Sequence, residues 1–182
     1  MVKKVGNLIP NTFFITKGSG ESDLEKHAGS YHMALYDAGI SDFNIMTYSS
    51  VIPATAHLAT MDELDLPPFG SEMKTIMAVS HGYQDEFVSA GVVYAWMYKD
   101  ENFDEKVGGL VCEVSGRYRI EELESRLSVL STIFIRRRMG SIILESLTLS
   151  PRESRSRNAM ERRWPPFALW ISFNRRSRNK SC

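Results

Sequence analysis

The chain has 182 residues, enough for one domain that buries a substantial core. Apolar residues make up 43% and charged residues 24%, the composition of a soluble globular protein. No apolar run approaches the roughly 18 residues of a membrane helix, and the amino terminus lacks a signal-peptide pattern. The two cysteines form neither a disulfide framework nor a metal-ligand spacing. We therefore expect a single cytoplasmic domain over residues 1–182, with no membrane contact and no metal site.

The first predicted elements are a strand and a helix. "NTFFITKG" (residues 11–18) is rich in residues that favour strands and is followed by a turn-prone segment. The next run, "ESDLEKHAGSYHMALYDAGI" (residues 21–40), predicts a helix. Ser22 with Glu25 three residues later forms a capping-box pattern, and Gly39 is a suitable end. The apolar stripe of this helix consists of Leu24, Ala28, Tyr31, Leu35 and Ala38.

The rest of the chain predicts mostly strands. "FNIMTYSSVI" (residues 43–52) is expected to be one strand. A second helix is predicted over residues 118–131, with Ile120, Leu123, Leu127 and Leu130 at helical spacing. The other predicted strands cover residues 74–83, 86–100, 107–116, 141–149 and 166–173. The pattern of several short strands with two helices indicates an α+β protein.

The charge is distributed unevenly along the chain. Residues 1–131 hold 10 Lys and Arg against 19 Asp and Glu, whereas residues 132–182 hold 12 against 3. This Arg-rich carboxyl-terminal segment leaves three alternatives open: a patch that binds nucleic acid or another anion, a solvated terminus, or translation from a shifted frame. Binding of nucleic acid is the least favoured, because no aromatic residues alternate with the basic ones in a recognisable motif.

The pair Ser49–Ser50 has a chemical possibility of its own. A serine hydroxyl can attack the carbonyl carbon of the preceding residue, which moves the acyl group from nitrogen to oxygen. Elimination across the resulting ester breaks the chain and leaves a dehydroalanine, which hydrolyses to a pyruvoyl group. The reaction needs a hydrogen-bond donor for the oxyanion on the attacked carbonyl. Two adjacent serines in an ordinary turn are common, so the pair alone does not establish this chemistry.

Three blocks of the chain together resemble the pyruvoyl-dependent arginine decarboxylases: "PNTFFITKGSGES", "AGSYHMALYDAGISDFNIMTYSSVIP" and "GGLVCEVSG". The resemblance covers roughly residues 9–130. It implies self-cleavage between Ser49 and Ser50, into a β chain of residues 1–49 and an α chain of residues 50–182 that begins with the pyruvoyl group.

The resemblance also implies roles for other residues. Asn44 matches the asparagine that assists cleavage, and Glu113 matches the glutamate that donates a proton after decarboxylation. Substrate contacts are expected from Ser49, His32 and Val111. Because Glu113 follows "GGLVC" on an apolar strand, we expect burial to raise its pKa and keep a proton available.

The activity implied is conversion of L-arginine to agmatine and carbon dioxide through a Schiff base with the pyruvoyl group, which acts as the electron sink. The implied fold is a four-layer α/β/β/α sandwich, and the implied assembly is a trimer with active sites between protomers. Agmatine would serve polyamine synthesis or acid resistance.

Two positions depart from the family pattern. His32 stands where the family has an aspartate for the substrate guanidinium, and Asp37 lies further along the helix. Pro165 and Pro166 fall where the family has a closing strand, and proline is excluded from central strands. The alternatives are therefore a decarboxylase of a different amino acid, or an inactive relative that does not cleave and binds an anionic partner through its tail.

Overall fold

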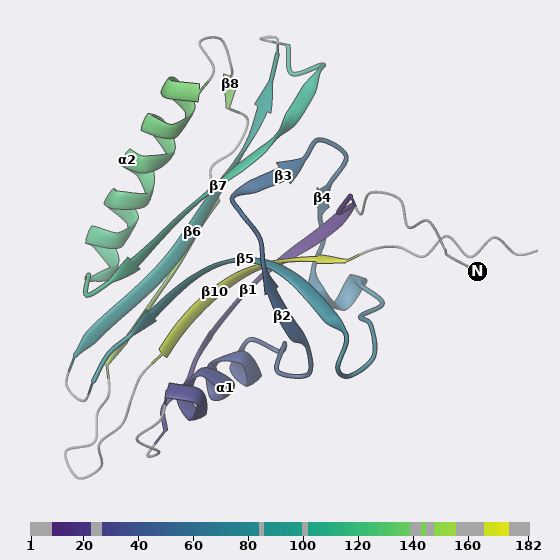
Figure 1. Ribbon diagram of the computed structural model, residues 1–182. Helices are drawn as coiled ribbons and strands as arrows, with labels where there is room; N and C mark the ends of the chain where they lie inside the picture. The colour runs from purple at the N-terminus through teal and green to yellow at the C-terminus, as the bar shows by residue number, and fades with distance from the viewer. Residues whose placement is uncertain are drawn as a thin grey trace, which may run out of the picture.

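The computed structural model describes residues 9–22, 27–83, 86–99, 102–138, 143–144, 148–155 and 166–174. These residues form an α+β fold with two helices and two five-stranded sheets, as the sequence predicts (Figure 1). A short 3-10 helix, η1 (Met61–Glu63), completes the elements.

The first sheet has the strand order β2-β5-β10-β1-β4. Its strands are β2 (Asn44–Thr47), β5 (Glu72–His81), β10 (Pro166–Asn174), β1 (Thr12–Ser19) and β4 (His57–Leu58). Strand β10 is antiparallel to both of its neighbours, whereas the two edge strands run parallel to theirs.

The second sheet has the order β3-β7-β6-β8, with β9 also paired to β6. Its strands are β3 (Val51–Pro53), β7 (Lys106–Gly116), β6 (Phe87–Tyr98), β8 (Ile143–Leu144) and β9 (Thr148–Arg155). Strand β6 is buried along almost its whole length.

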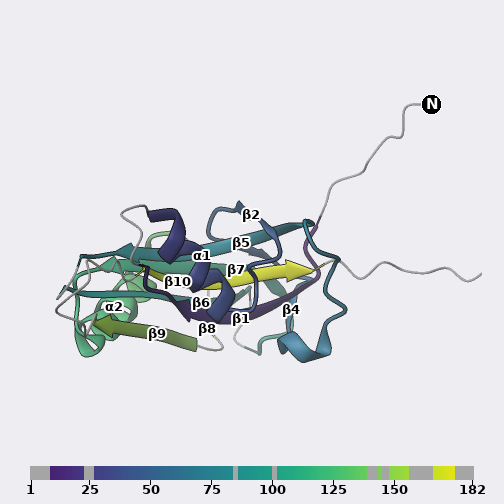
Figure 2. The same cartoon turned by 90° about the horizontal axis from the view of Figure 1, so that it is seen from below.

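Each helix covers a different sheet. Helix α1 (His27–Asp37) contacts β1 and β10, and helix α2 (Ile120–Arg138) contacts β6 and β7. Figures 1 and 2 show the two helices on opposite outer sides of the pair of sheets.

Gly39 follows α1 with a φ of 74°, a left-handed conformation that glycine adopts without steric cost, which confirms it as the end of the helix. The proposed cap at Ser22 depends on Glu25, which lies outside the described residues.

Three apolar clusters hold these layers together. The cluster between the sheets joins Phe13 and Ile76 of the first sheet to Val92 and Trp96 of the second. It exists because side chains alternate along each strand, so that one face of every strand points inward.

The other two clusters lie beneath the helices. Phe14, Leu35 and Ile40 are buried under α1, and Leu123 and Leu127 pack on Val93 beneath α2. Leu35 and Ala38 of the expected apolar stripe are buried and Tyr31 is half-buried; the positions of Leu24 and Ala28 lie outside what is described of the side chains.

The Arg-rich segment contributes a central strand, contrary to the expectation from its prolines. β10 lies between β5 and β1 and pairs with both along its length. Pro166 is tolerated because it is the first residue of the strand. Its missing N–H therefore leaves the hydrogen bonds between β10 and its neighbours unbroken along the rest of the strand.

The expected single strand over residues 43–52 is also wrong. The structure divides it into β2, which pairs with β5 in the first sheet, and β3, which pairs with β7 in the second. Residues 48–50 form the crossover between the sheets, and β2 and Ser49 are more exposed than the apolar sequence suggests.

Neither helix of the described residues has the length and apolar character needed to cross a bilayer.

The cluster between the sheets predicts a large effect for Phe13→Ala. Phe13 is fully buried, with its ring edge-on to Tyr94 and Trp96 at centroid distances of 5.6 and 6.0 Å. We expect a loss of about 3–5 kcal/mol in the free energy of unfolding, measured by urea denaturation. The control is Phe69→Ala, because Phe69 is 84% exposed and its loss should cost at most about 0.5 kcal/mol. Equal losses would contradict the assignment of this core.

Candidate functional site

The crossover residues Ser49 and Ser50 are held by the pairing of β3 with β7. Val51 lies opposite Leu110 and Ile52 opposite Gly109 in an antiparallel register. The register continues one residue beyond the strand, because the N–H of Val111 donates to the carbonyl oxygen of Ser50 at 3.0 Å. Ser50 is therefore fixed opposite Val111, at the end of the short strand.

Two glycines of β7 let β3 approach this closely. A Cβ atom on Gly108 would lie 2.9 Å from the backbone oxygen of Ile52, and one on Gly109 would lie 3.1 Å from Trp96 and Ile52 side-chain atoms. Gly108 also has a φ of 155°, which side-chain-bearing residues rarely adopt. The "GG" of the "GGLVCE" block is thus the reason that β3 can dock here.

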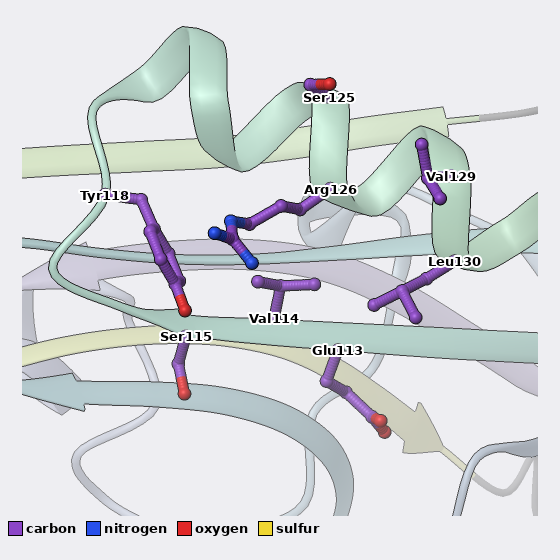
Figure 3. Close-up of a pocket in the computed structure, with 8 residues that line it drawn as sticks. All are labelled: Glu113, Val114, Ser115, Tyr118, Ser125, Arg126, Val129 and Leu130. Atoms are coloured by element: carbon purple, nitrogen blue, oxygen red, sulfur yellow. The ribbon is translucent and has the colours of Figure 1, made fainter.

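Ser50 and Glu113 form the central contact of the site. The Ser50 Oγ donates to Glu113, at 2.9 Å from Oε1 and 3.1 Å from Oε2. The register explains the contact: Val111 is opposite Ser50, and Glu113 is two residues further along β7 on the same face. Figure 3 shows the Glu113 side chain pointing away from α2, whereas that of Val114 points toward the helix. Sequence reasoning singled out both Ser50 and Glu113, and the fold brings them together across 63 positions.

Burial sets the acid–base character of this contact. Desolvation raises the pKa of Glu113 above its ordinary value, and the hydrogen bond from Ser50 opposes that rise. Burial, with the nearby charge of Glu113, also raises the pKa of the Cys112 thiol. The expectation of an elevated Glu113 pKa agrees with the structure.

The peptide unit between the serines is folded in a tight turn. The N–H of Val51 donates to the carbonyl oxygen of Ser49 at 2.8 Å, a hydrogen bond between residues two apart. Ser50, at the centre of this turn, does not have a positive φ, so the turn is of the common inverse γ type found at strand ends. No side-chain pattern in the sequence indicated this backbone contact.

The other expected site residues lie elsewhere in the single chain. Asn44 begins β2, and its Nδ2 donates to the Gly70 carbonyl oxygen at 2.6 Å rather than to the serines. His32 is exposed on α1, which packs on the first sheet. Val111 is buried, and the contact that it makes with Ser50 is the hydrogen bond from its N–H to the Ser50 carbonyl oxygen. Asp37 accepts a hydrogen bond from the Ser19 N–H.

A hollow of about 570 Å³ lies between β7 and α2, on the other face of β7 from Ser50. Its lining residues are Glu113, Val114, Ser115, Tyr118, Ser125, Arg126, Val129 and Leu130 (Figure 3). Because the Glu113 side chain points away from α2, this hollow does not contain the serine–carboxyl contact.

In the described part of the chain, no three His, Cys, Asp or Glu side chains gather into a possible metal site.

A serine hydroxyl held against a half-buried carboxyl group, at a crossover between sheets, defines a site for acid–base chemistry on that serine. Comparison with known proteins identifies the class: the family model for pyruvoyl-dependent arginine decarboxylase matches residues 12–154. The chain belongs to this family, whose name specifies a pyruvoyl group.

Individual relatives agree with the family match. A pyruvoyl-dependent arginine decarboxylase of Thermoplasma volcanium is 27% identical over 160 residues, covering 80% of this chain and 85% of the relative. One of Picrophilus torridus is 31% identical over 105 residues, covering 53% and 57%. One of Methanopyrus kandleri is 36% identical over 76 residues, covering 41% and 46%. The chain thus aligns with little more than half of the Picrophilus protein and with most of the Thermoplasma protein.

The close approach at Gly108 predicts that Gly108→Ala displaces β3. A methyl group there would meet backbone, which cannot rotate away as a flexible side chain does. We expect the Val111 amide, which depends on Ser50 for its hydrogen bond, to exchange with deuterium at least tenfold faster. Ser115→Ala on the exposed part of β7 is the control and should leave this rate unchanged. Unaltered exchange in Gly108→Ala would show that β3 docks without needing the glycine.

Proposed function

We propose that this chain cleaves itself between Ser49 and Ser50 and then decarboxylates L-arginine to agmatine and carbon dioxide. The observation that carries the proposal is the hydrogen bond from Ser50 Oγ to the half-buried Glu113, at 2.9 Å, in a member of the pyruvoyl-dependent arginine decarboxylase family. The products are a β chain of residues 1–49 and an α chain of residues 50–182, from one domain.

Self-cleavage proceeds by an acyl shift, an elimination and a hydrolysis. Ser50 Oγ bonds to the Ser49 carbonyl carbon, the carbon–nitrogen bond breaks, and the hydroxyl proton ends on the freed nitrogen. Loss of the Ser50 α proton then breaks the Cβ–Oγ bond, which leaves a carboxylate on Ser49 and a dehydroalanine at position 50. One water molecule hydrolyses the imine tautomer of this residue and ammonia departs, so that a ketone remains.

The residues around Ser50 fit a pyruvoyl group. When present, the group supplies an electron sink for the electrons released as carbon dioxide leaves. The Val111 N–H holds the carbonyl of residue 50, and this contact needs no part of the side chain that the reaction transforms. Glu113 contacts the side chain of residue 50 from the same face of the sheet.

Glu113 is proposed to hold the proton that the substrate α carbon receives. A carboxyl group with an ordinary pKa is almost fully ionised at neutral pH and has no proton to give. Burial raises the pKa of Glu113 and so increases the protonated fraction. Before cleavage, the same carboxylate accepts the hydrogen bond that orients the Ser50 hydroxyl.

The remaining site residues are proposed from the family resemblance. His32, on the exposed side of α1, and the new Ser49 carboxylate contact the substrate, while Val111 acts through its backbone. Asn44 acts on cleavage by fixing the Gly70 loop from which β5 continues, since its side chain donates to Gly70.

A trimer with active sites between protomers is proposed from the family resemblance, and the exposure of both His32 and Ser49 leaves them accessible to a neighbouring protomer. A four-layer α/β/β/α arrangement is supported by three apolar clusters, one between the sheets and one beneath each helix. A cytoplasmic location is proposed from the buried, unpaired Cys112.

Intact mass tests the proposal against the alternative of an inactive relative with an anion-binding tail. The uncleaved chain has a mass of 20.7 kDa. Scaled by residue number, cleavage after Ser49 gives pieces of about 5.6 and 15.1 kDa, and the larger one should react with a carbonyl probe. Ser50→Ala removes the attacking hydroxyl and should remain whole. A wild-type chain that stays at full mass while binding an anionic partner in a salt-dependent manner would favour the alternative.

Glu113→Gln separates cleavage from decarboxylation. The amide oxygen can still accept the Ser50 hydrogen bond, so we expect cleavage to persist, but the amide has no acidic proton, so kcat should fall at least 100-fold. In the wild type, kcat should be constant at low pH and fall as the pH rises through the raised pKa of Glu113, because the protonated form is then lost. A cleaved Glu113→Gln enzyme with normal kcat would exclude this proton donor.

A further inference from the structure

We propose that the backbone N–H of Val51 is the oxyanion donor in the self-cleavage of this chain. The inference rests on the proposed function, since it assigns a role within the cleavage reaction. When Ser50 Oγ attacks, the carbonyl oxygen of Ser49 takes up the negative charge, and it is this oxygen that the Val51 N–H already contacts at 2.8 Å. Donors at about 2.7–3.1 Å from a developing oxyanion are the usual geometry for such stabilisation.

The pairing of β3 leaves this N–H available. In an antiparallel ladder, hydrogen-bonded and non-hydrogen-bonded residue pairs alternate. The Val111 N–H donates to the Ser50 carbonyl, so Ser50 is in a hydrogen-bonded position and Val51, opposite Leu110, is in the next, non-hydrogen-bonded one. The Val51 N–H therefore points away from β7, toward the crossover, and its contact with Ser49 costs the sheet no hydrogen bond.

The same pairing holds the donor in place before the reaction. Ile52, the next residue, is fully buried, and Val111 fixes the Ser50 carbonyl on the other side of the Val51 nitrogen. A donor fixed in this way needs no reorganisation as charge develops, which is the source of its advantage over water. Ser50 Oγ is in turn positioned by Glu113, so the docking of β3 sets both the nucleophile and the donor.

The side chain of Asn44 does not occupy this position. Its Nδ2 donates to Gly70 at 2.6 Å, at the far end of β2 from the serines. The sequence predicted that a donor is needed without identifying it, and the group found against the Ser49 oxygen is the main-chain N–H of Val51. Val51 can therefore be any residue that keeps its N–H, and its side chain is 52% exposed and free to vary.

The test compares substitutions that keep or remove one N–H. Val51→Ala keeps it and should cleave at the wild-type rate. Val51→Pro removes it at an edge position where proline is compatible with a sheet, and we expect cleavage to slow about 100-fold or more. Cleavage is followed by intact mass in pulse-chase from synthesis, with circular dichroism and thermal unfolding to establish that each chain folds.

A second variant covers failure of the proline chain to fold. The α-hydroxy acid counterpart of valine, placed at position 51 in the full chain, replaces the N–H with an ester oxygen and retains the side chain; cleavage should again slow about 100-fold. Normal cleavage in a folded Val51→Pro chain or in the ester variant would overturn the assignment. A wild-type chain that never cleaves would instead refute the proposed function itself, so the two failures are distinguishable.

Discussion

The site depends on the close docking of a three-residue strand, β3, against two glycines of β7. Gly108 and Gly109 leave room for the backbone and side chain of Ile52, and this contact sets the register that continues to Ser50 and Val111. Once Ser50 is opposite Val111, the period-two alternation of β7 places Glu113 on the same face. The hydroxyl–carboxyl contact is therefore a consequence of strand register, and a shift of β3 by one residue would place the Ser50 side chain on the face opposite Glu113.

In the proposed function, the carboxyl group of Glu113 serves two stages with opposite demands. Before cleavage it accepts a hydrogen bond from Ser50, which favours its ionised form, and in the proposed decarboxylation it must carry a proton. Burial and the serine hydrogen bond act on its pKa in opposite directions, with burial the larger. Because the proposed reaction removes the Ser50 hydroxyl, it also removes one of the two contributions that lower the pKa of Glu113, so the proposed cleavage favours the protonated carboxyl group.

The Arg-rich carboxyl-terminal segment takes part in the same fold. Its strand β10 occupies the centre of the first sheet, between β5 and β1, and β9 pairs with β6 of the second. The family match continues to residue 154, past the point where the charge balance changes. Both sheets thus draw on residues from the acidic part and from the basic part of the chain.

The sequence by itself determined most of the long strands, helix α2 and the two side chains that meet at the candidate site. Runs of strand-favouring residues bounded by turn signals predicted β1, β5, β6 and β7, helical spacing predicted α2, and the block resemblance singled out Ser50 and Glu113. Only the tertiary structure decided that residues 43–52 divide between two sheets, that Pro166 begins a central strand, and that the Val51 N–H faces the Ser49 oxygen. The physical reason is that local patterns specify conformation along the chain, whereas pairing partners and backbone donors depend on contacts between distant segments, here 63 positions apart for Ser50 and Glu113.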